Sequence, residues 1–374
     1  MRFRDLFIRD AAGGISSLFP KHNTYFSFNT RVAIRKACDV LNLIPGDEVL
    51  APAYNCGSEI DPLHHAGLTI RLYPVDRHTH PDLDEIERMI GPRTRAVYLT
   101  HYFGFLQPEV TALRALCDSH GLWLIEDCAL SLLSGAQPAE GYTGDIAVFC
   151  FYKFFPTLAG GALVLNNDRL AADISFEGSV PMHQMVKHLV RTGLSMTLGA
   201  ERSAAILQML RRGGKQDTPS ISTAGSELPD MPPHYYFDSH LRDAPISLFA
   251  ARPLQSFNSK QTISARRRNY RIYLEALSDM PKATPLFPEL PESVCPLSMP
   301  VLTNNRDALA AALVARGIPA TPWWAGYNQH LDWTACEDAC YLKDHVLALP
   351  LDQYLEPVTI KHIAQELHML LRAE

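Results

Sequence analysis

The segments RAVYLTHYFG (residues 95–104), PEVTALRALCDSHG (108–121) and LWLIEDCA (122–129) decide the fold. The first and third are short apolar runs that end in polar residues, which is typical of buried strands. The middle segment carries apolar side chains at helical spacing and is closed by Gly121. A strand, a helix and a second strand in this order predict a βαβ unit with parallel strands.

The same alternation continues on both sides of this unit. Helical patterns at 31–43 and 82–90 alternate with strand-like runs at 45–54, 68–76, 145–154 and 161–167. The sequence therefore predicts an α/β protein with a mostly parallel sheet. Ligands of such sheets bind beyond the carboxyl ends of the strands, so polar residues at those ends are candidates for a functional site. The residues at these positions are Tyr54, His101, Asp127 and Lys153.

Length and composition bound the organisation of the chain. Its 374 residues, of which 47% are hydrophobic and 20% charged, are typical of a globular protein with two or three domains. We expect a large domain over residues 1–250, with an atypical basic helical insert at about 176–235, and a small domain over 251–374. The net charge of −6 excludes a general attraction to nucleic acid.

The cysteines and the absence of targeting signals bear on the compartment. Cysteines are spread through the chain, often in apolar runs such as LIEDCAL, which is typical of buried free thiols in a reducing compartment. Only Cys336 and Cys340 approach the spacing of metal ligands, so no metal site is expected. The first residues do not resemble a secretory signal, and no apolar run is long enough to span a membrane. We therefore expect a cytoplasmic protein.

Asp127 and Lys153 are the residues from which the chemistry is inferred. Asp127 ends an apolar run, where a carboxylate can keep the pyridine nitrogen of pyridoxal 5′-phosphate (PLP) protonated and make the ring an electron sink. Lys153 lies among aromatic residues in CFYKFFP. Burial lowers the pKa of a lysine and favours the neutral amine that forms a Schiff base. The alternative interpretations are an acid that caps the next helix and a lysine that snorkels from a strand edge.

A phosphate site is expected where the first helix begins. Asn29, Thr30 and Arg31 stand at that point, and free backbone N–H groups at a helix N-terminus attract anions. A plain helix cap is the alternative interpretation of Asn29 or Thr30. Cys150 is a further candidate near the phosphate, although a thiol is a weak donor.

Other side chains are candidates for the faces and rim of the same pocket. Tyr54 follows a short strand and is expected to cover one face of a flat cofactor, with the smaller Cys56 beside it. His101 ends another strand and is expected to line the pocket. A core aromatic residue and a hydrogen-bonded buried histidine are the alternative interpretations.

The segments NTRVAIRKA, PGDEVLAPAYNCGSEIDPLHHAGL, LWLIEDCALSL, GDIAVFCFYKF and GGALVLNN follow one another in this order, and SARRRNYRIYLEAL and DHVLALPLDQYL come after them. This series resembles the DegT/DnrJ/EryC1/StrS family of PLP-dependent nucleotide-sugar aminotransferases. The resemblance covers most of the chain except 176–230. It implies the aspartate-aminotransferase fold (PLP fold type I), with a seven-stranded, mainly parallel sheet in a large domain and a small α+β C-terminal domain.

The resemblance also implies roles for residues and partners. Lys153 would carry the cofactor, Asp127 would pair with its pyridine nitrogen, and Asn29 and Thr30 would hold its phosphate. The amino donor would be an amino acid, glutamate or glutamine, and the carbonyl acceptor a nucleotide-linked keto sugar of polysaccharide or secondary-metabolite biosynthesis. The family implies a homodimer with shared active sites. The residues expected at the cofactor are Asn29, Thr30, Arg31, Tyr54, Cys56, His101, Asp127, Leu130, Cys150 and Lys153.

Three positions depart from the family pattern. Leu130 stands where the family has glutamine or histidine, Cys150 where it has serine, and Cys56 where it has a ring-stacking aromatic residue. A PLP enzyme of the same fold that acts on a non-sugar amine or carbonyl compound is therefore an alternative hypothesis. A catalytically silent scaffold is a third hypothesis, which the retention of Lys153 and Asp127 disfavours.

The stretch 183–215 is rich in basic side chains and contains a single acid, Glu201. A membrane surface, an anionic substrate and a flap over a dimer interface are alternative partners for such a segment. The simpler interpretation is a charged surface helix without a partner.

Overall fold

The computed structural model describes residues 18–19, 23–135, 141–155, 157, 159–170, 174–180, 228–247, 250–251, 254 and 258–373. The basic stretch 183–215, with the membrane or substrate contact considered for it, lies outside the described residues, as does most of the expected insert at 176–235. Among the described residues, no helix combines the length and the apolarity that crossing a membrane requires. All eight cysteines are free thiols, and seven of them are buried.

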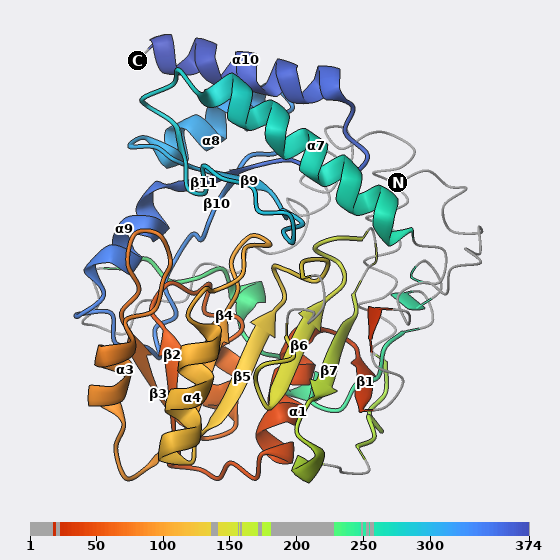
Figure 1. Cartoon of the computed structure of the whole chain (residues 1–374), viewed down its shortest axis with the longest axis vertical. Coiled ribbons are helices and arrows are strands. Elements are labelled where there is room, and N and C mark those ends of the chain that lie inside the picture. Colours follow the sequence, from red (N-terminus) through yellow and green to blue (C-terminus); the bar gives the residue numbers. More distant parts are fainter. Residues whose placement is uncertain are drawn as a thin grey trace, which may run out of the picture.

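The large sheet has seven strands in the order β1-β7-β6-β5-β4-β2-β3 (Figure 1). These are β1 (Thr24–Ser27), β2 (Glu48–Pro52), β3 (Thr69–Tyr73), β4 (Thr94–Thr100), β5 (Trp123–Cys128), β6 (Ile146–Cys150) and β7 (Gly161–Leu165). The strands from β2 to β6 are parallel, whereas β7 runs antiparallel to both β6 and β1. The predicted α/β fold with a mostly parallel, seven-stranded sheet is confirmed.

Four helices accompany this sheet: α1 (Thr30–Val40), α2 (Asp61–His65), α3 (Leu83–Met89) and α4 (Val110–His120). The Asn29 side chain caps α1 by accepting the Val32 N–H at 3.0 Å. Helix α4 ends at Gly121, whose φ of 66° is left-handed and favours glycine. The start of α1 and the end of α4 are thus each marked by a residue suited to that position.

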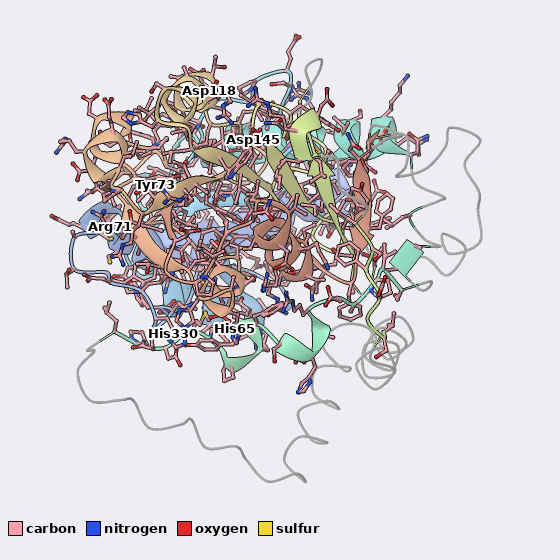
Figure 2. All side chains as sticks on the ribbon, turned by 90° about the horizontal axis from the view of Figure 1, so that it is seen from below. His65, Arg71, Tyr73, Asp118, Asp145 and His330 are labelled. Carbon is pink, nitrogen blue, oxygen red and sulfur yellow. The ribbon has the colours of Figure 1, made fainter. Side chains whose placement is uncertain are left out.

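Asp145 fastens α4 to the sheet next to the start of β6. Its Oδ2 atom accepts the Arg114 guanidinium at 2.7 Å and the Leu124 N–H at 2.8 Å. Arg114 also pairs with Asp118 on its own helix, and both acids are labelled in Figure 2. A buried, multiply bonded carboxylate at this point fixes the spacing of β5 and β6, the two strands that lead to Asp127 and Lys153.

A second sheet lies in the C-terminal part, in the order β10-β11-β9-β8. Its strands are β8 (Thr284–Pro285), β9 (Met299–Leu302), β10 (Thr321–Pro322) and β11 (Val346–Leu349). The helices of this part are α7 (Ser259–Leu277), α8 (Arg306–Ala315), α9 (Glu337–His345) and α10 (Pro357–Ala373). Helices α7 and α10 lie side by side, and α9 lies toward the β2–β3 side of the large sheet (Figure 1). The domain boundary at residue 251 stays a prediction.

Candidate active site

The carboxyl ends of the parallel strands bring the predicted site residues to one edge of the large sheet. In the register of β4 and β5, Thr100 lies opposite Asp127, and in that of β5 and β6, Asp127 lies opposite Val148. His101 follows Thr100 directly, and Lys153 follows the end of β6 by three residues. This edge is where ligands of open α/β sheets bind.

Asp127 is a buried carboxylate held by two hydrogen bonds. Its Oδ1 atom accepts the Ala129 N–H at 2.8 Å, and its Oδ2 atom accepts the Tyr98 hydroxyl at 2.7 Å. Burial raises the pKa of Asp127, and the nearby Glu59 carboxylate raises it further, while Lys153 and the two hydrogen bonds lower it. Asp127 is therefore a fixed acceptor that a cationic N–H group would stabilise.

Lys153 lies in the turn after β6 and is half-buried. Within the described part of the chain, its ammonium makes no hydrogen bond or ion pair. Burial lowers the pKa of Lys153, but the neighbouring Tyr152, Cys150, Cys56 and Asp127 raise it more, so the net shift is upward. The predicted lowering is therefore wrong for the protein without a ligand, because acidic neighbours outweigh burial. The amine must pass a proton to another group before it can act as a nucleophile.

The N-terminus of α1 packs directly against β6 and β7. The Thr30 hydroxyl donates to the Phe149 carbonyl at 3.0 Å, and the same side chain lies beside the Cys150 thiol. A Cβ atom on Gly161 would lie 2.7 Å from the Thr30 nitrogen, so only glycine permits this approach. The N–H groups of Thr30 and Arg31 precede the first intrahelical hydrogen bond, which makes this helix end suited to an anion.

The Arg31 guanidinium holds a segment from a distant part of the sequence. Its Nη1 atom donates to the carbonyls of His234, Tyr235 and Tyr236 at 2.9–3.0 Å. These residues belong to or follow the short helix η4 (Pro233–Tyr235). Tyr235 in turn interacts electrostatically with Lys153. Arg31 thus fixes the 234–236 segment beside the site, and its expected contact with a phosphate stays a prediction.

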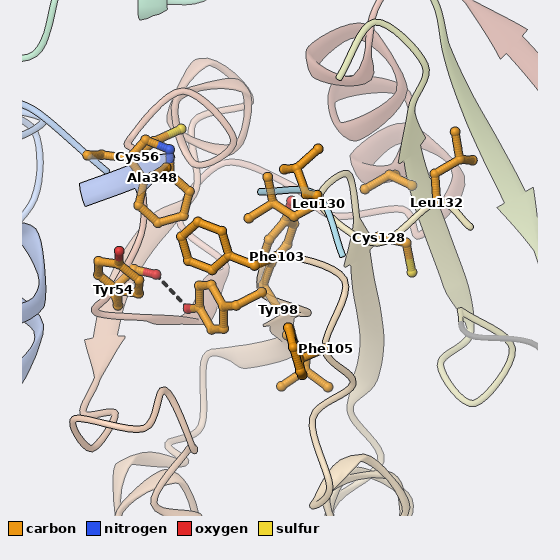
Figure 3. Close-up of a cluster of buried hydrophobic side chains, with 14 of the residues drawn as sticks. Tyr54, Cys56, Tyr98, Phe103, Phe105, Cys128, Leu130, Leu132 and Ala348 are labelled. Carbon is orange, nitrogen blue, oxygen red and sulfur yellow. Dashed lines mark hydrogen bonds between the residues drawn. The ribbon is translucent and has the colours of Figure 1, made fainter. Parts of the chain in front are cut away.

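Tyr54, Cys56 and Leu130 belong to one cluster of buried side chains (Figure 3). The ring of Tyr54 is fully buried and lies 5.3 Å from the ring of Tyr102 and 4.9 Å from that of Trp324. Its hydroxyl donates to the Trp323 carbonyl at 2.5 Å. Tyr54 therefore ties the edge of the large sheet to the C-terminal part. Contacts of Tyr54, Cys56 and Leu130 with a cofactor stay predictions.

His101 is a buried histidine with both ring nitrogens engaged. Its Nδ1 atom accepts the Gln107 N–H at 3.1 Å, which leaves the proton of the neutral ring on Nε2, 3.0 Å from Glu126 Oε2. The alternative interpretation of His101 as a hydrogen-bonded core residue describes this geometry. Its place in the lining of a cofactor pocket stays a prediction.

Three side chains of this neighbourhood are absent from the sequence prediction. Tyr98 donates to Asp127, Glu59 accepts the Cys56 N–H at 2.9 Å, and Lys343 donates to the Asn55 carbonyl at 2.8 Å. Glu59 carried a usable signal, because it stands in the polar stretch NCGSE that follows a strand end, where ligands of parallel sheets bind. Tyr98 and Lys343 carried none, because a buried tyrosine in a strand and a lysine in a charged helix are common.

The donor set of this edge fits PLP. The cofactor needs an amine to carry it, a carboxylate for its ring nitrogen and an anion site for its phosphate. Lys153, Asp127 and the N-terminus of α1 with Thr30 are the corresponding groups of this chain. The close packing of Gly161 on Thr30 leaves the helix end without an obstructing side chain.

Curated proteins with sequences similar to this chain include sugar aminotransferases. The GDP-perosamine synthase of Vibrio cholerae is 28% identical over 232 residues, which cover 59% of this chain but only 62% of that protein's own length. The UDP-N-acetyl-3-dehydro-alpha-D-glucosamine 3-aminotransferase of Acidithiobacillus ferrooxidans is 28% identical over 344 residues, covering 89% of this chain and 80% of that protein.

Solved structures support the fold. The aminotransferase TlmJ of Streptoalloteichus hindustanus superposes with a TM-score of 0.68 at 20% identity, covering 96% of this chain and 89% of that one. The aminotransferase PseC of Helicobacter pylori gives a TM-score of 0.67 at 18% identity, covering 96% and 90%. Both superpositions cover the large sheet and the C-terminal part together. The model of the DegT/DnrJ/EryC1/StrS aminotransferase family matches residues 26–212, half of the chain, and the chain belongs to that family.

Proposed function

We propose that this chain is a PLP-dependent aminotransferase that moves an amino group from an amino acid, glutamate or glutamine, to a nucleotide-linked keto sugar. The observation that carries the proposal is the placement of Asp127 and Lys153 at the neighbouring carboxyl ends of β5 and β6, beside the N-terminus of α1, which packs on β6 and β7. The family supports the reaction class. The names of the Vibrio and Acidithiobacillus relatives support an amino sugar as the product.

Each of the three groups has a distinct role in this proposal. PLP, when bound, supplies an electrophilic carbonyl and an electron-withdrawing ring. Asp127 holds a proton on the ring nitrogen, because its carboxylate is fixed by Tyr98 and Ala129 and gains from a cationic partner. The free N–H groups at the N-terminus of α1 bind the phosphate, and the Thr30 hydroxyl can donate to it only by leaving the Phe149 carbonyl. Lys153 carries the cofactor and, once released, moves a proton at its Nζ atom.

The protonation of Lys153 decides when it can act. Its ammonium form is favoured in the protein alone, because burial lowers its pKa less than Tyr152, Cys150, Cys56 and Asp127 together raise it. When Asp127 pairs with a cationic ring nitrogen, its negative charge no longer favours the ammonium form. Asp127 engaged in this way would no longer add to the upward shift of the Lys153 pKa, while Tyr152, Cys150 and Cys56 still would.

The proposal includes a homodimer with shared active sites, as the family resemblance implies. Sedimentation equilibrium of the purified chain tests it. We expect the mass of a dimer at micromolar concentration, and a monomer that retains full turnover would contradict shared sites.

A transamination assay tests the reaction. The purified protein is supplied with PLP, glutamate or glutamine, and keto sugars linked to several nucleotides, and the amino sugar is detected by mass spectrometry. Lys153→Ala serves as the control and should form no product. The proposal fails if the wild-type protein consumes no amino donor, or if it forms no more product than Lys153→Ala with every acceptor. Non-sugar ketones in the same panel separate the sugar acceptor from the reaction class.

A further inference from the structure

Lys343 is a lysine in the interior of the protein, on helix α9. It is 1% exposed, and its ammonium donates to the Asn55 carbonyl at 2.8 Å. The same ammonium lies over the rings of Tyr327 and Trp333, 4.8 and 5.0 Å from their centroids. Taking an ammonium out of water costs several kcal/mol, and one neutral acceptor with two aromatic faces offsets only part of that. A buried charge of this kind requires an anionic partner or a function.

The acceptor belongs to a turn that carries two ionisable groups into the cofactor site. Glu59 of this turn is 8% exposed and accepts both the N–H and the thiol of Cys56. Glu59 interacts electrostatically with Lys343 on one side and with Asp127 on the other. Cys56 interacts with Lys153 in the same way. Two acids, Glu59 and Asp127, therefore lie next to each other in this region, with Lys343 beside the first and Lys153 beside the second.

The turn has little freedom to adjust by itself. The Asn55 side chain donates to the Pro52 carbonyl at 2.8 Å and accepts the Gly57 N–H at 2.9 Å. The Gly57 carbonyl accepts the Asn328 side chain at 3.3 Å, and the Asn328 carbonyl accepts the indole N–H of Trp333 at 3.0 Å. Trp333, one of the two aromatic residues that face Lys343, is thus tied through Asn328 to the same turn that Lys343 holds. A change at Lys343 must reach Cys56 and Glu59.

We propose that Lys343 is a positioning residue of the cofactor site, whose buried ammonium holds the Asn55–Glu59 turn and balances the Glu59 carboxylate beside Lys153 and Asp127. This inference rests on the proposed function, because it assigns Lys343 an effect on the cofactor held at Lys153. Lys343 touches neither Lys153 nor Asp127 by any described hydrogen bond and acts through Glu59 and the turn.

The groups around Lys343 set its own charge. Burial lowers its pKa to about 8, the acidic groups Cys56 and Glu59 of the turn and Cys340 of α9 oppose this, and Arg306 of α8 adds to it. The remaining close neighbours, Tyr327 and Trp333, are aromatic rings. Lys343 therefore loses its charge as the pH rises through about 8, and the region around Glu59 then becomes more negative.

The test uses Lys343→Met, Glu59→Gln and the double variant, each compared with the wild type. The visible absorbance band of the lysine-bound cofactor is followed as a function of pH, and its midpoint is the pH at which half of the nitrogen joining cofactor and lysine is protonated. Loss of a nearby positive charge favours protonation of this nitrogen, so we expect the midpoint to rise by roughly one pH unit in Lys343→Met. Loss of a negative charge should lower it in Glu59→Gln, and the double variant should lie near the wild type. Lys282→Met, which removes a lysine bonded to the Leu371 carbonyl at 2.8 Å, is the matched control and should leave the midpoint unchanged.

A second readout needs no cofactor. Unfolding of the four cofactor-free proteins gives a double-mutant cycle, in which paired charges lose less stability together than the sum of the single losses. Additive losses, or midpoints that stay at the wild-type value in both single variants, would overturn the proposal. If Lys343→Met does not fold, a midpoint in Glu59→Gln that stays at the wild-type value would by itself overturn the proposal. A wild type without any visible band refutes the proposed function, while the cycle still decides whether Lys343 and Glu59 are paired.

Discussion

Replacement of Tyr98 by phenylalanine removes one of the two hydrogen bonds that hold Asp127. The Tyr98 hydroxyl lies 2.7 Å from Asp127 Oδ2, both groups are buried, and this bond lowers the pKa of Asp127. A hydrogen bond to a charged group contributes about 1.5–3 kcal/mol, and 1.36 kcal/mol corresponds to one pKa unit. Because the Ala129 N–H and Lys153 remain, we expect the pKa of Asp127 to rise by about one unit.

The consequence is a change in the pH dependence of PLP binding. Asp127 must be anionic to hold a proton on the ring nitrogen, so PLP affinity of the cofactor-free protein should fall as Asp127 becomes protonated. In Tyr98→Phe this acidic midpoint should lie about one pH unit higher than in the wild type, with similar affinity at mildly alkaline pH. Titration of PLP into the cofactor-free protein, followed by absorbance across the acidic range, measures the midpoint.

Tyr73→Phe is a matched control for this experiment. The Tyr73 hydroxyl is equally buried but donates to the Tyr98 backbone carbonyl at 2.9 Å, a neutral group. Its loss should cost about 0.5–1.5 kcal/mol of stability and leave the midpoint of PLP binding unchanged. Equal midpoints in the wild type, Tyr98→Phe and Tyr73→Phe would refute the role assigned to Asp127.

Three further predictions concern the helix end, the neighbouring segment and the buried lysine. Gly161→Ala places a Cβ atom 2.7 Å from the Thr30 nitrogen, so overpacking of about 1–3 kcal/mol should lower the melting temperature and weaken PLP binding; an unchanged dissociation constant would contradict the phosphate site. Arg31→Met removes three hydrogen bonds to residues 234–236, and amide exchange there should accelerate while exchange in α4 stays constant. The folded pKa of Lys343, about 8, lies below its unfolded value of 10.5, so the unfolded chain binds more protons between these values. Over that window the stability of the wild type should rise with pH relative to Lys343→Met, by at most about 1.4 kcal/mol per pH unit, and parallel stability curves would contradict a buried titrating lysine.

The sheet could be predicted from sequence because strands and helices alternate with clear periods. Asp127 and Lys153 stood out for a related reason: each follows an apolar run, and parallel strands place their carboxyl ends together. The capping side chain of Asn29 and the glycine after α4 are local signals that the structure bears out. In each case the information lies within a few residues of the feature.

Partners that are distant in sequence could not be predicted in this way. Lys343 and Asn55 are separated by 288 positions, and no local pattern of α9 distinguishes Lys343 from its charged neighbours. The direction of the Lys153 pKa shift could not be predicted either. It depends on how many acidic groups surround the amine, whereas an apolar sequence context indicates burial alone. His101 faces Glu126 of the adjacent strand, a pairing that requires the register of β4 and β5.

Identification of the amine that carries the cofactor tests the central claim most directly. The protein is incubated with PLP, treated with borohydride to fix the cofactor to its lysine, digested and analysed by mass spectrometry. We predict that the label lies on the peptide containing Lys153 and is absent from Lys153→Ala. A label on Lys343 or another lysine, or no label on any lysine, would contradict the account.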